Sequence, residues 1–355
     1  MGDSCKPKVL YIELMDNNRG NLTVDLRYIR ILSRITNLTV ASPLGWYESL
    51  DKKIKNIEYA RRNSDAIIDY FRNGITNIRE LFQLDKQFHF DFIFCASYET
   101  YLHALVPLGI PDTKRRVYIC NHNNIDLMDR KKIKQMAFRL YKNKVQHIVF
   151  EEFMKMHLAS KYHIAIENVH KLTYPIDEQC SSGEKIYDCV GISNSNNESW
   201  VRDMVALQRD TKLLTVHNLK VILRSKEITY EDSNLIVING YLEKHEYENY
   251  ISGAKMILLP YPDSFQHRMS GALVDALMNL VKVCGTPIPV FKHYEELYPH
   301  ICKTINSCDD LIEALLRTSS QDEENQDFDK FMFDHSDATI EEEFKNMFCK
   351  NGAGK

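Results

Sequence analysis

Short apolar runs, rich in β-branched and aromatic residues, alternate along nearly the whole chain with longer segments of helical periodicity. In the first half the runs are Lys8–Glu13, Leu38–Ser42, Asn56–Ala60, Phe90–Ser97, Arg115–Asn121 and Gln146–Glu151. In the second half they are Tyr187–Ser193, Asn218–Ser225, Asn234–Gly240, Ala254–Tyr261 and Val281–Thr286. Apolar runs that are each followed by a helical pattern predict parallel strands with crossover helices, and therefore an α/β fold.

The alternation pauses once, near His170–Asp177, and a small polar stretch typical of a linker follows. We therefore predict two Rossmann-like domains with parallel sheets that face a cleft, at residues 1–177 and 178–335. The acidic and polar residues 319–337 are expected to form a solvated connection. A last helix within residues 336–355 is expected to pack back on the first domain.

Composition restricts the function classes. The formal net charge is −4, which argues against a dedicated nucleic-acid binder. The nine cysteines include no C-x-x-C pair, so we expect buried reduced thiols. No segment reaches the ~18 uninterrupted apolar residues of a membrane span. We expect a cytoplasmic protein, at most peripheral at the inner face of a membrane.

The most informative segment is Ala254–Phe291, in which an apolar strand leads through a Pro-Tyr-Pro turn and a polar loop to Ser270, Gly271 and the helix ALVDALMNL. In an open parallel sheet, ligands bind at the carboxyl ends of the strands, where helix N-termini offer free N–H groups to phosphate. Gly271 lets a phosphate approach the backbone closely. Ser270 is suited to cap the helix or to donate to the same phosphate.

Asp275 lies about one turn further along this predicted helix. A carboxylate at this place can accept two hydrogen bonds from a ribose diol. An ordinary surface Asp that is stabilised by the helix dipole is the alternative. The neighbouring Ser270 and Gly271 favour the functional interpretation.

The segment resembles the donor-binding region of retaining glycosyltransferases of the GT-B fold, especially family four. Residues 239–261 and 150–177 are similar to further runs of that family, and the ordered resemblance covers roughly residues 145–300. The resemblance implies that Asp275 holds the ribose. It also implies that Ser270 and Gly271 hold the distal phosphate, and it places Tyr261 in the donor site.

The chain departs from the family at two places. His267 stands where the family has a glutamate that contacts the sugar, so His267 and Arg268 are candidate catalytic residues. Arg268 is a suitable counter-ion for a diphosphate, although a solvated loop residue fits equally well. The loop Asn194–Asn197 lacks the family's Arg and Lys. Arg224, or Lys226, is the candidate substitute.

Three loops of the first half are expected at the same kind of sheet edge. The first contains Asn18 and Gly20, where the family has a glycine-rich loop, although a plain strand–helix turn is equally consistent. The second contains Glu99, a candidate acceptor ligand or a carboxylate at a helix start. The third contains Asn121, a candidate acceptor ligand, and His122. In similar enzymes a His at this strand end lies near the reacting sugar.

The segment Arg130–Lys144 carries seven basic residues, and Ile133, Met136, Ala137 and Leu140 share one face of its predicted helix. Such a helix can lie on anionic lipid, which would suit an acceptor held on a lipid carrier. The more usual interpretation, which we favour from the sequence, places this apolar face in the core.

The resemblance implies a hexosyltransferase that moves sugar from a nucleotide-diphosphate sugar to a saccharide or lipid-linked saccharide, in surface polysaccharide biosynthesis. It implies retention of configuration and no cofactor besides the nucleotide-sugar co-substrate. We predict metal independence because the Asp-x-Asp string of most interest, Asp327–Asp329, falls in the acidic connection. The alternative is a non-catalytic relative that binds a nucleotide or a partner. A sugar-binding protein is a third hypothesis.

Overall fold

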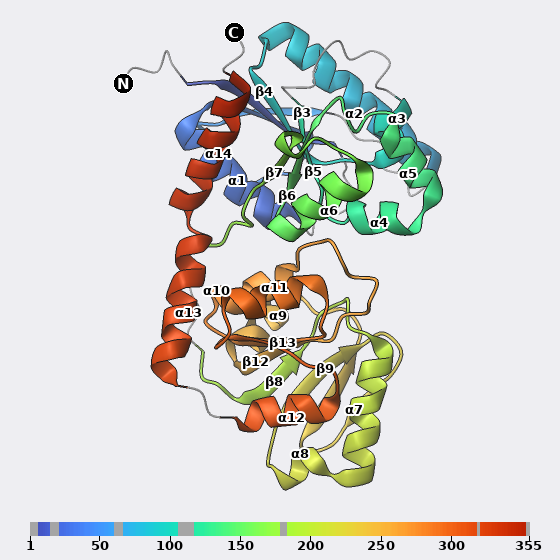
Figure 1. Ribbon diagram of the computed structural model, residues 1–355, viewed down its shortest axis with the longest axis vertical. Coiled ribbons are helices and arrows are strands. Elements are labelled where there is room, and N and C mark those ends of the chain that lie inside the picture. The colour runs from blue at the N-terminus through green and yellow to red at the C-terminus, as the bar shows by residue number, and fades with distance from the viewer. Residues whose placement is uncertain are drawn as a thin grey trace. The chain divides into compact units, whose positions relative to one another are not determined.

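The computed structural model describes residues 6–14, 21–59, 67–105, 117–177, 183–317 and 320–352. The chain divides into two compact units (Figure 1). The first unit comprises Met1–Pro175 and His335–Lys355, and the second comprises Ile176–Asp334. Each unit contains one seven-stranded sheet.

All strand pairs of the first sheet are parallel, and the strand order is β3-β2-β1-β4-β5-β6-β7. The strands are β1 Lys8–Glu13, β2 Asn37–Pro43, β3 Lys55–Tyr59, β4 Phe92–Ser97, β5 Val117–Cys120, β6 Gln146–Val149 and β7 Val169–Lys171. The helices are α1 Leu22–Ile35, α2 Ile67–Phe88, α3 Thr100–Leu105, α4 Asn124–Arg130, α5 Lys132–Arg139, α6 Glu152–Tyr162 and α14 Asp337–Gly352.

The second sheet has the order β10-β11-β9-β8-β12-β13-β14, with only the β10–β11 pair antiparallel. Its strands are β8 Tyr187–Gly191, β9 Val221–Ser225, β10 Tyr230–Glu231, β11 Leu235–Asn239, β12 Ala254–Leu259, β13 Lys282–Gly285 and β14 Cys302–Thr304. The helices are α7 Glu198–Thr211, α8 Leu213–Val216, α9 Lys244–Ser252, α10 Gly271–Met278, α11 Pro289–Leu297, α12 Cys308–Leu316 and α13 Gln321–Asp334.

Central strands in both sheets are buried because helices cover their two faces. In β1, every residue after Lys8 is buried, and four of the six residues of β12 are consecutive buried apolar side chains. Such strands have apolar residues on both faces, which is why the sequence shows continuous runs instead of alternation. The α/β prediction with two Rossmann-like parallel sheets is confirmed.

The prediction of buried thiols is confirmed for six of the seven described cysteines and is wrong for the seventh. Cys95, Cys120, Cys189, Cys284, Cys302 and Cys308 are buried and free, whereas Cys349 is free and exposed. Within the described ranges, no helix is both long and apolar enough to cross a bilayer.

The prediction of a solvated connection at residues 319–337 is wrong, because α13 fills most of that range. Phe328 and Phe331 lie one helical turn apart and are buried, and Asp327 accepts a hydrogen bond from the His300 backbone N–H at 2.8 Å. The buried side of α13 was not predicted because the segment is acidic overall. Most of the charged residues near the two phenylalanines point to solvent. Helix α14 then packs on α1, where Asp337 pairs with Arg30 and Arg34 at 2.9 and 2.8 Å.

The core interpretation of the apolar face of residues 130–144 is also wrong. Helix α5 turns Ile133, Met136 and Leu140 to solvent, with exposed fractions of 72%, 64% and 61%. Phe138 and Tyr141, which belong to the opposite side, are the residues that enter the core.

Candidate functional site

The turn before α10 has the geometry that an anion site at a helix N-terminus requires. Ser270 is the N-cap, and its side chain accepts the Leu273 backbone N–H at 3.1 Å. The backbone N–H groups of Gly271 and Ala272 donate to no group in the parts of the chain that the structure describes. These two donors, at the positive end of the helix dipole, are therefore available to a ligand.

Tyr261 fixes this turn against the loops of neighbouring strands. Its hydroxyl lies 2.9 Å from the Ser270 hydroxyl and accepts from the Ser193 hydroxyl at 3.0 Å, while its carbonyl accepts from Thr286 at 2.7 Å. Burial raises the pKa of Tyr261, and the hydroxyls of Ser193 and Ser270 oppose that shift. Since the phenol is 3% exposed, Tyr261 positions the turn, and its predicted donor contact stays a prediction.

Asp275 lies on the half-buried side of α10, four residues after Gly271, so both face the same side of the helix. The Tyr247 hydroxyl of α9 donates to Asp275 Oδ2 at 3.2 Å. A carboxylate held by a phenol in this way is oriented for a further hydrogen-bond donor. The contact of Asp275 with a sugar diol stays a prediction.

Arg224 provides a cation at the carboxyl end of β9. Its guanidinium forms no ion pair or hydrogen bond with any described residue. Partial burial lowers its pKa, and the nearby Tyr241 opposes that shift. Because β9 and β8 are parallel neighbours, Arg224 lies at the same edge of the sheet as the loop after β8.

That loop contains a second open polar atom. Asn196 is 8% exposed, and its side-chain amide donates to the carbonyls of Gly191 and Arg224 at 2.7 and 3.0 Å. Its Oδ1 is buried without a donor among the residues that the structure places. A buried acceptor without a partner is costly, so a ligand donor or an ordered water fits here.

His267 and Arg268 belong to the polar loop that precedes Ser270. Both are half-buried, and the Arg268 guanidinium lies 3.9 Å from the centre of the Phe265 ring. The aromatic face therefore restricts the Arg268 side chain instead of leaving it in free solution. Their catalytic roles stay predictions.

In the first unit, the loops after β4 and β5 are joined by buried hydrogen bonds. Asn121 is fully buried, donates to the Ile148 carbonyl at 3.0 Å, and accepts from the Tyr98 hydroxyl at 2.6 Å. Asn121 therefore supports the sheet edge, and no side-chain atom of it faces solvent. Its acceptor contact stays a prediction.

Glu99 likewise has partners for both carboxylate oxygens. Oε2 accepts from the backbone N–H groups of Tyr101 and Leu102 at the start of α3, and Oε1 pairs with Lys134 of α5 at 2.7 Å. This arrangement fits the interpretation of Glu99 as a carboxylate at a helix start more closely than the interpretation of Glu99 as an acceptor ligand.

Among the described first-unit residues that the sequence predicted for the site, His122 has a ring nitrogen without a hydrogen-bond partner. Its Nε2 donates to the Ala96 carbonyl at 2.9 Å. Burial lowers its pKa to about 4, and the Ala96 hydrogen bond opposes that shift, so the ring is neutral near pH 7. With the proton on Nε2, the other nitrogen, Nδ1, is an acceptor for a hydroxyl.

The predictions for Asn18 and Gly20 fall outside the described residues. Sequence reasoning missed Asn196 and Tyr247. For Asn196 the signal was present, since a run of polar residues follows the strand at Asn194–Asn197, but the resemblance predicts basic side chains at this place. Nothing in the sequence of α9 marks Tyr247 as a partner of Asp275.

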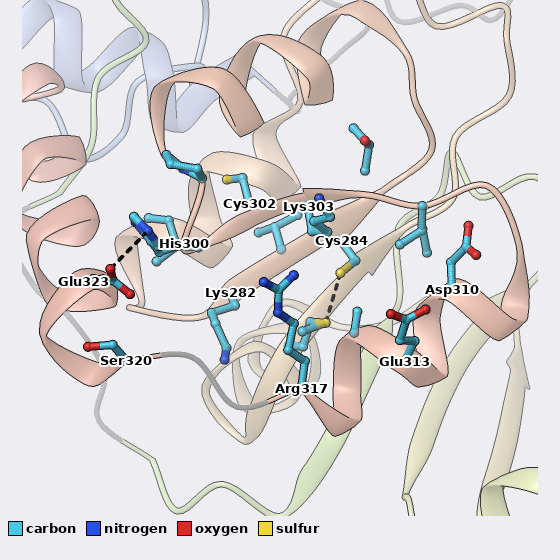
Figure 2. Close-up of a pocket in the computed structure, with 17 residues that line it drawn as sticks. Lys282, Cys284, His300, Cys302, Lys303, Asp310, Glu313, Arg317, Ser320 and Glu323 are labelled. Carbon is cyan, nitrogen blue, oxygen red and sulfur yellow. Dashed lines mark hydrogen bonds and ion pairs between the residues drawn. The ribbon is translucent and has the colours of Figure 1, made fainter.

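A cavity of about 630 Å³ lies elsewhere in the second unit (Figure 2). Figure 2 shows Lys282, Lys303 and Arg317 around it together with Asp310 and Glu313. It extends along Lys282–Cys284 of β13 and Cys302–Ile305 at β14, away from the turn before α10. No predicted site residue lines it, and its rim carries charges of both signs.

No protein-family model matches the chain, and no curated protein matches it in sequence. Its fold is nevertheless similar to solved structures over nearly its whole length. Anabaena HepE in complex with UDP-glucose has a TM-score of 0.67 at 10% identity, covering 97% of this chain and 100% of that one. A glycosyltransferase from Rickettsia africae has a TM-score of 0.66 at 9% identity, covering 99% and 100%.

The lipopolysaccharide outer core galactosyltransferase WaaB, in its apo form, has a TM-score of 0.60 at 11% identity, covering 97% and 99%. At such low identity the likeness establishes the fold alone. The two mostly parallel sheets match those of GT-B glycosyltransferases, as the sequence predicted.

Proposed function

We propose that the chain is a glycosyltransferase that moves a sugar from a nucleotide-diphosphate sugar to a saccharide or lipid-linked saccharide. The observation that carries the proposal is the pair of open N–H groups of Gly271 and Ala272, with Asp275 on the same side of α10. Solved structures of similar fold include HepE with UDP-glucose bound and two proteins described as glycosyl- or galactosyltransferases.

In the proposed reaction, the acceptor hydroxyl oxygen bonds to the anomeric carbon while the bond from that carbon to the phosphate oxygen breaks. The acceptor hydroxyl passes its proton to the departing phosphate oxygen, and the nucleoside diphosphate takes the electron pair of the broken bond. The α10 N-terminus and the Arg224 guanidinium stabilise the negative charge that grows on the leaving group. Arg268, restricted by Phe265, is a second candidate for that task.

Asp275 accepts the ribose hydroxyls, held in position by the Tyr247 hydroxyl. In the first unit, His122 accepts a hydrogen bond at Nδ1 from a hydroxyl of the saccharide. Because burial keeps its pKa at about 4, His122 acts as a neutral hydrogen-bond acceptor and not as a proton store near pH 7.

Three finer features belong to the same proposal. Retention of configuration and membership of family four follow from the sequence resemblance. Metal independence is supported by the chemistry of the site, since helix N–H groups and a guanidinium can carry the diphosphate charge. A role in surface polysaccharide synthesis is supported by the likeness to WaaB, which is described as a lipopolysaccharide outer core galactosyltransferase. A cytoplasmic location belongs to the same proposal.

A panel of nucleotide-diphosphate sugars tests the proposal, with ligand-induced thermal stabilisation and donor hydrolysis as readouts. The wild type is compared with Asp275→Ala and with Asp210→Ala, a control that removes an exposed carboxylate from α7. We expect stabilisation and hydrolysis in the wild type and control, and loss of both in Asp275→Ala. An equal response from all three proteins would reject the assigned donor site.

A second candidate is a nucleotide-binding relative without turnover. It is favoured by His267, which stands where the similar family has a glutamate, and by the absence of a basic residue at Asn194–Asn197. Stabilisation by a nucleoside diphosphate without hydrolysis or transfer for any donor would identify this second function.

A further inference from the structure

Helix α5 displays an apolar ridge to solvent. Ile133 and Met136 of α5, with the C-cap Leu140 that continues the helical conformation, follow the spacing of successive helical turns, and all three are more than half exposed. At about 100° per residue, their side chains fall within roughly 60° of one another around the helix. Exposed apolar side chains are ordinary when single, but a ridge of three along one helix calls for an occupant.

The ridge is fixed in this orientation by the rest of the first unit. On the other side of α5, Phe138 is fully buried and makes ring contacts with Tyr141, His147 and Tyr162 at 5.2–5.4 Å. Lys134 pairs with Glu99 at 2.7 Å, with both side chains 12% exposed or less. The helix therefore cannot roll its ridge inward without removing Phe138 from the core.

The charges around the ridge have one sign. The segment from Arg130 to Lys144 contains seven basic residues and no acidic residue. Lys131, Lys132, Arg139 and Lys144 are exposed, and helical geometry puts Lys132 and Arg139 beside Met136. The remaining basic side chains are engaged internally, as Lys134 is with Glu99 and Lys142 with the His163 carbonyl.

We propose that this face of α5, defined by Ile133, Met136 and Leu140 with the four exposed cations, docks the first unit onto an anionic lipid bilayer. Apolar side chains enter the acyl boundary, and the cations meet phosphate headgroups. A purely apolar partner would leave the cations unpaired, and a purely acidic one would leave the ridge in water. The eight-residue helix is far too short to span the membrane, so the contact is peripheral.

The docking face is connected to the end of β4, where the Ala96 carbonyl accepts the hydrogen bond from His122, the first-unit residue of the proposed function. Glu99, which receives Lys134, also caps α3 directly after the strand β4 and its loop. Docking would therefore fix the loop after β4 near a lipid surface. The idea that docking brings this loop to an acceptor carried on a lipid rests on the proposed glycosyl transfer. Docking itself does not.

Vesicle co-sedimentation tests the docking, using the full chain without nucleotide. Vesicles contain phosphatidylcholine alone, or phosphatidylcholine and phosphatidylglycerol in equal parts. We expect binding to the anionic vesicles that falls at least about tenfold in the triple variant Ile133→Ser, Met136→Ser, Leu140→Ser, and similarly in Lys132→Glu, Arg139→Glu. The control Leu44→Ser, Val216→Ser removes two equally exposed apolar side chains, of 69% and 71% exposure, and should bind as the wild type does.

A fluorescence readout locates the contact. The two native tryptophans, Trp46 and Trp200, are buried, so the emission of Met136→Trp reports on the ridge. We expect a blue shift of that emission on adding anionic vesicles. Absence of vesicle binding, or binding that the ridge and charge variants leave unchanged, would overturn the proposal. The proposal would also be overturned if the wild type self-associates without binding lipid and the triple ridge variant is monomeric. UDP stabilisation of the same variants, measured without lipid, tests the proposed function separately.

Discussion

Each unit uses a buried asparagine to join the carboxyl ends of neighbouring strands, but the two asparagines are satisfied differently. Asn121 donates to the Ile148 carbonyl, and its oxygen accepts from Tyr98 at 2.6 Å. Asn196 donates to the Arg224 carbonyl, yet its oxygen has no donor among the described residues. The first edge is internally complete around Asn121, where His122 Nδ1 is its open atom, whereas the second leaves the Asn196 oxygen itself open.

The difference continues through the neighbours of the two asparagines. Around Asn121, both oxygens of Glu99 are occupied by α3 and Lys134. Around Asn196, the Arg224 guanidinium and the first N–H groups of α10 are open. Open polar groups at a sheet edge mark a ligand site more reliably than the mere position of polar residues there. Changes at Asn121 and Glu99 should therefore alter stability, and changes at the second edge should alter ligand binding.

The largest expected effect is on stability, in Asn121→Leu. This change removes the side-chain hydrogen bonds to Tyr98 and Ile148 and puts an apolar group against the buried Tyr98 hydroxyl, at a cost of about 3 kcal/mol in the free energy of unfolding. The Ile148 carbonyl keeps the backbone N–H of residue 121. Urea unfolding measures it, and Asn143→Leu, at an exposed position, is the control. Nucleotide stabilisation should persist in the folded variant. A loss of binding without a loss of stability would break the comparison.

The next effect concerns binding, in Arg224→Ala. Because this guanidinium has no protein partner among the described residues, its removal should leave unfolding nearly unchanged while UDP affinity falls by about 2 kcal/mol, or about thirtyfold. Calorimetric titration with UDP checks it against Arg209→Ala on α7. If Arg224→Ala binds UDP normally, the second edge is not the diphosphate site.

A smaller effect is the pH dependence contributed by Asp25 on α1. Burial raises the pKa of Asp25 to about 7, while hydrogen bonds from Tyr11 and Tyr47 oppose the rise. The folded chain thus holds a proton that the unfolded chain releases, and stability from this residue falls as pH rises from the ordinary Asp value toward 7.

We expect Asp25→Asn to flatten this slope, changing the stability difference between about pH 6 and pH 8 by about 1.4 kcal/mol. Thermal unfolding across that range measures it. An unchanged slope in the variant would show that Asp25 is ionised in the folded first unit.

The smallest expected effect concerns His122, whose protonation state should contribute no pH dependence to donor turnover. Because its pKa is about 4, its protonation should not change between about pH 5.5 and pH 8. The pH profile of donor turnover should therefore be the same in wild type and in His122→Gln apart from a lower kcat. An inflection near pH 6.5 that disappears in His122→Gln would show a titrating, less buried ring.

Sequence reasoning predicted the parallel strands because their burial on two faces produces continuous apolar runs. It also predicted the Ser270 cap, since a Ser–Gly pair before an apolar helix has a local cause. It failed at α13 and α5, where the choice of buried side depends on neighbours far along the chain: Phe328 and Phe331 are buried within an acidic segment, and Phe138 takes the core position that Ile133 was expected to fill. It could not tell that both Glu99 oxygens are occupied, because Lys134 comes from another helix.

The central claim is that the first N–H groups of α10 hold the diphosphate of a nucleotide sugar. Nuclear magnetic resonance of protein labelled with ¹⁵N-glycine tests it directly, because only 13 glycines give signals and Gly271→Ala identifies the one of interest. The claim predicts that UDP shifts the Gly271 amide resonance strongly and that uridine, which lacks phosphates, does not. UDP binding that leaves this resonance in place would contradict it.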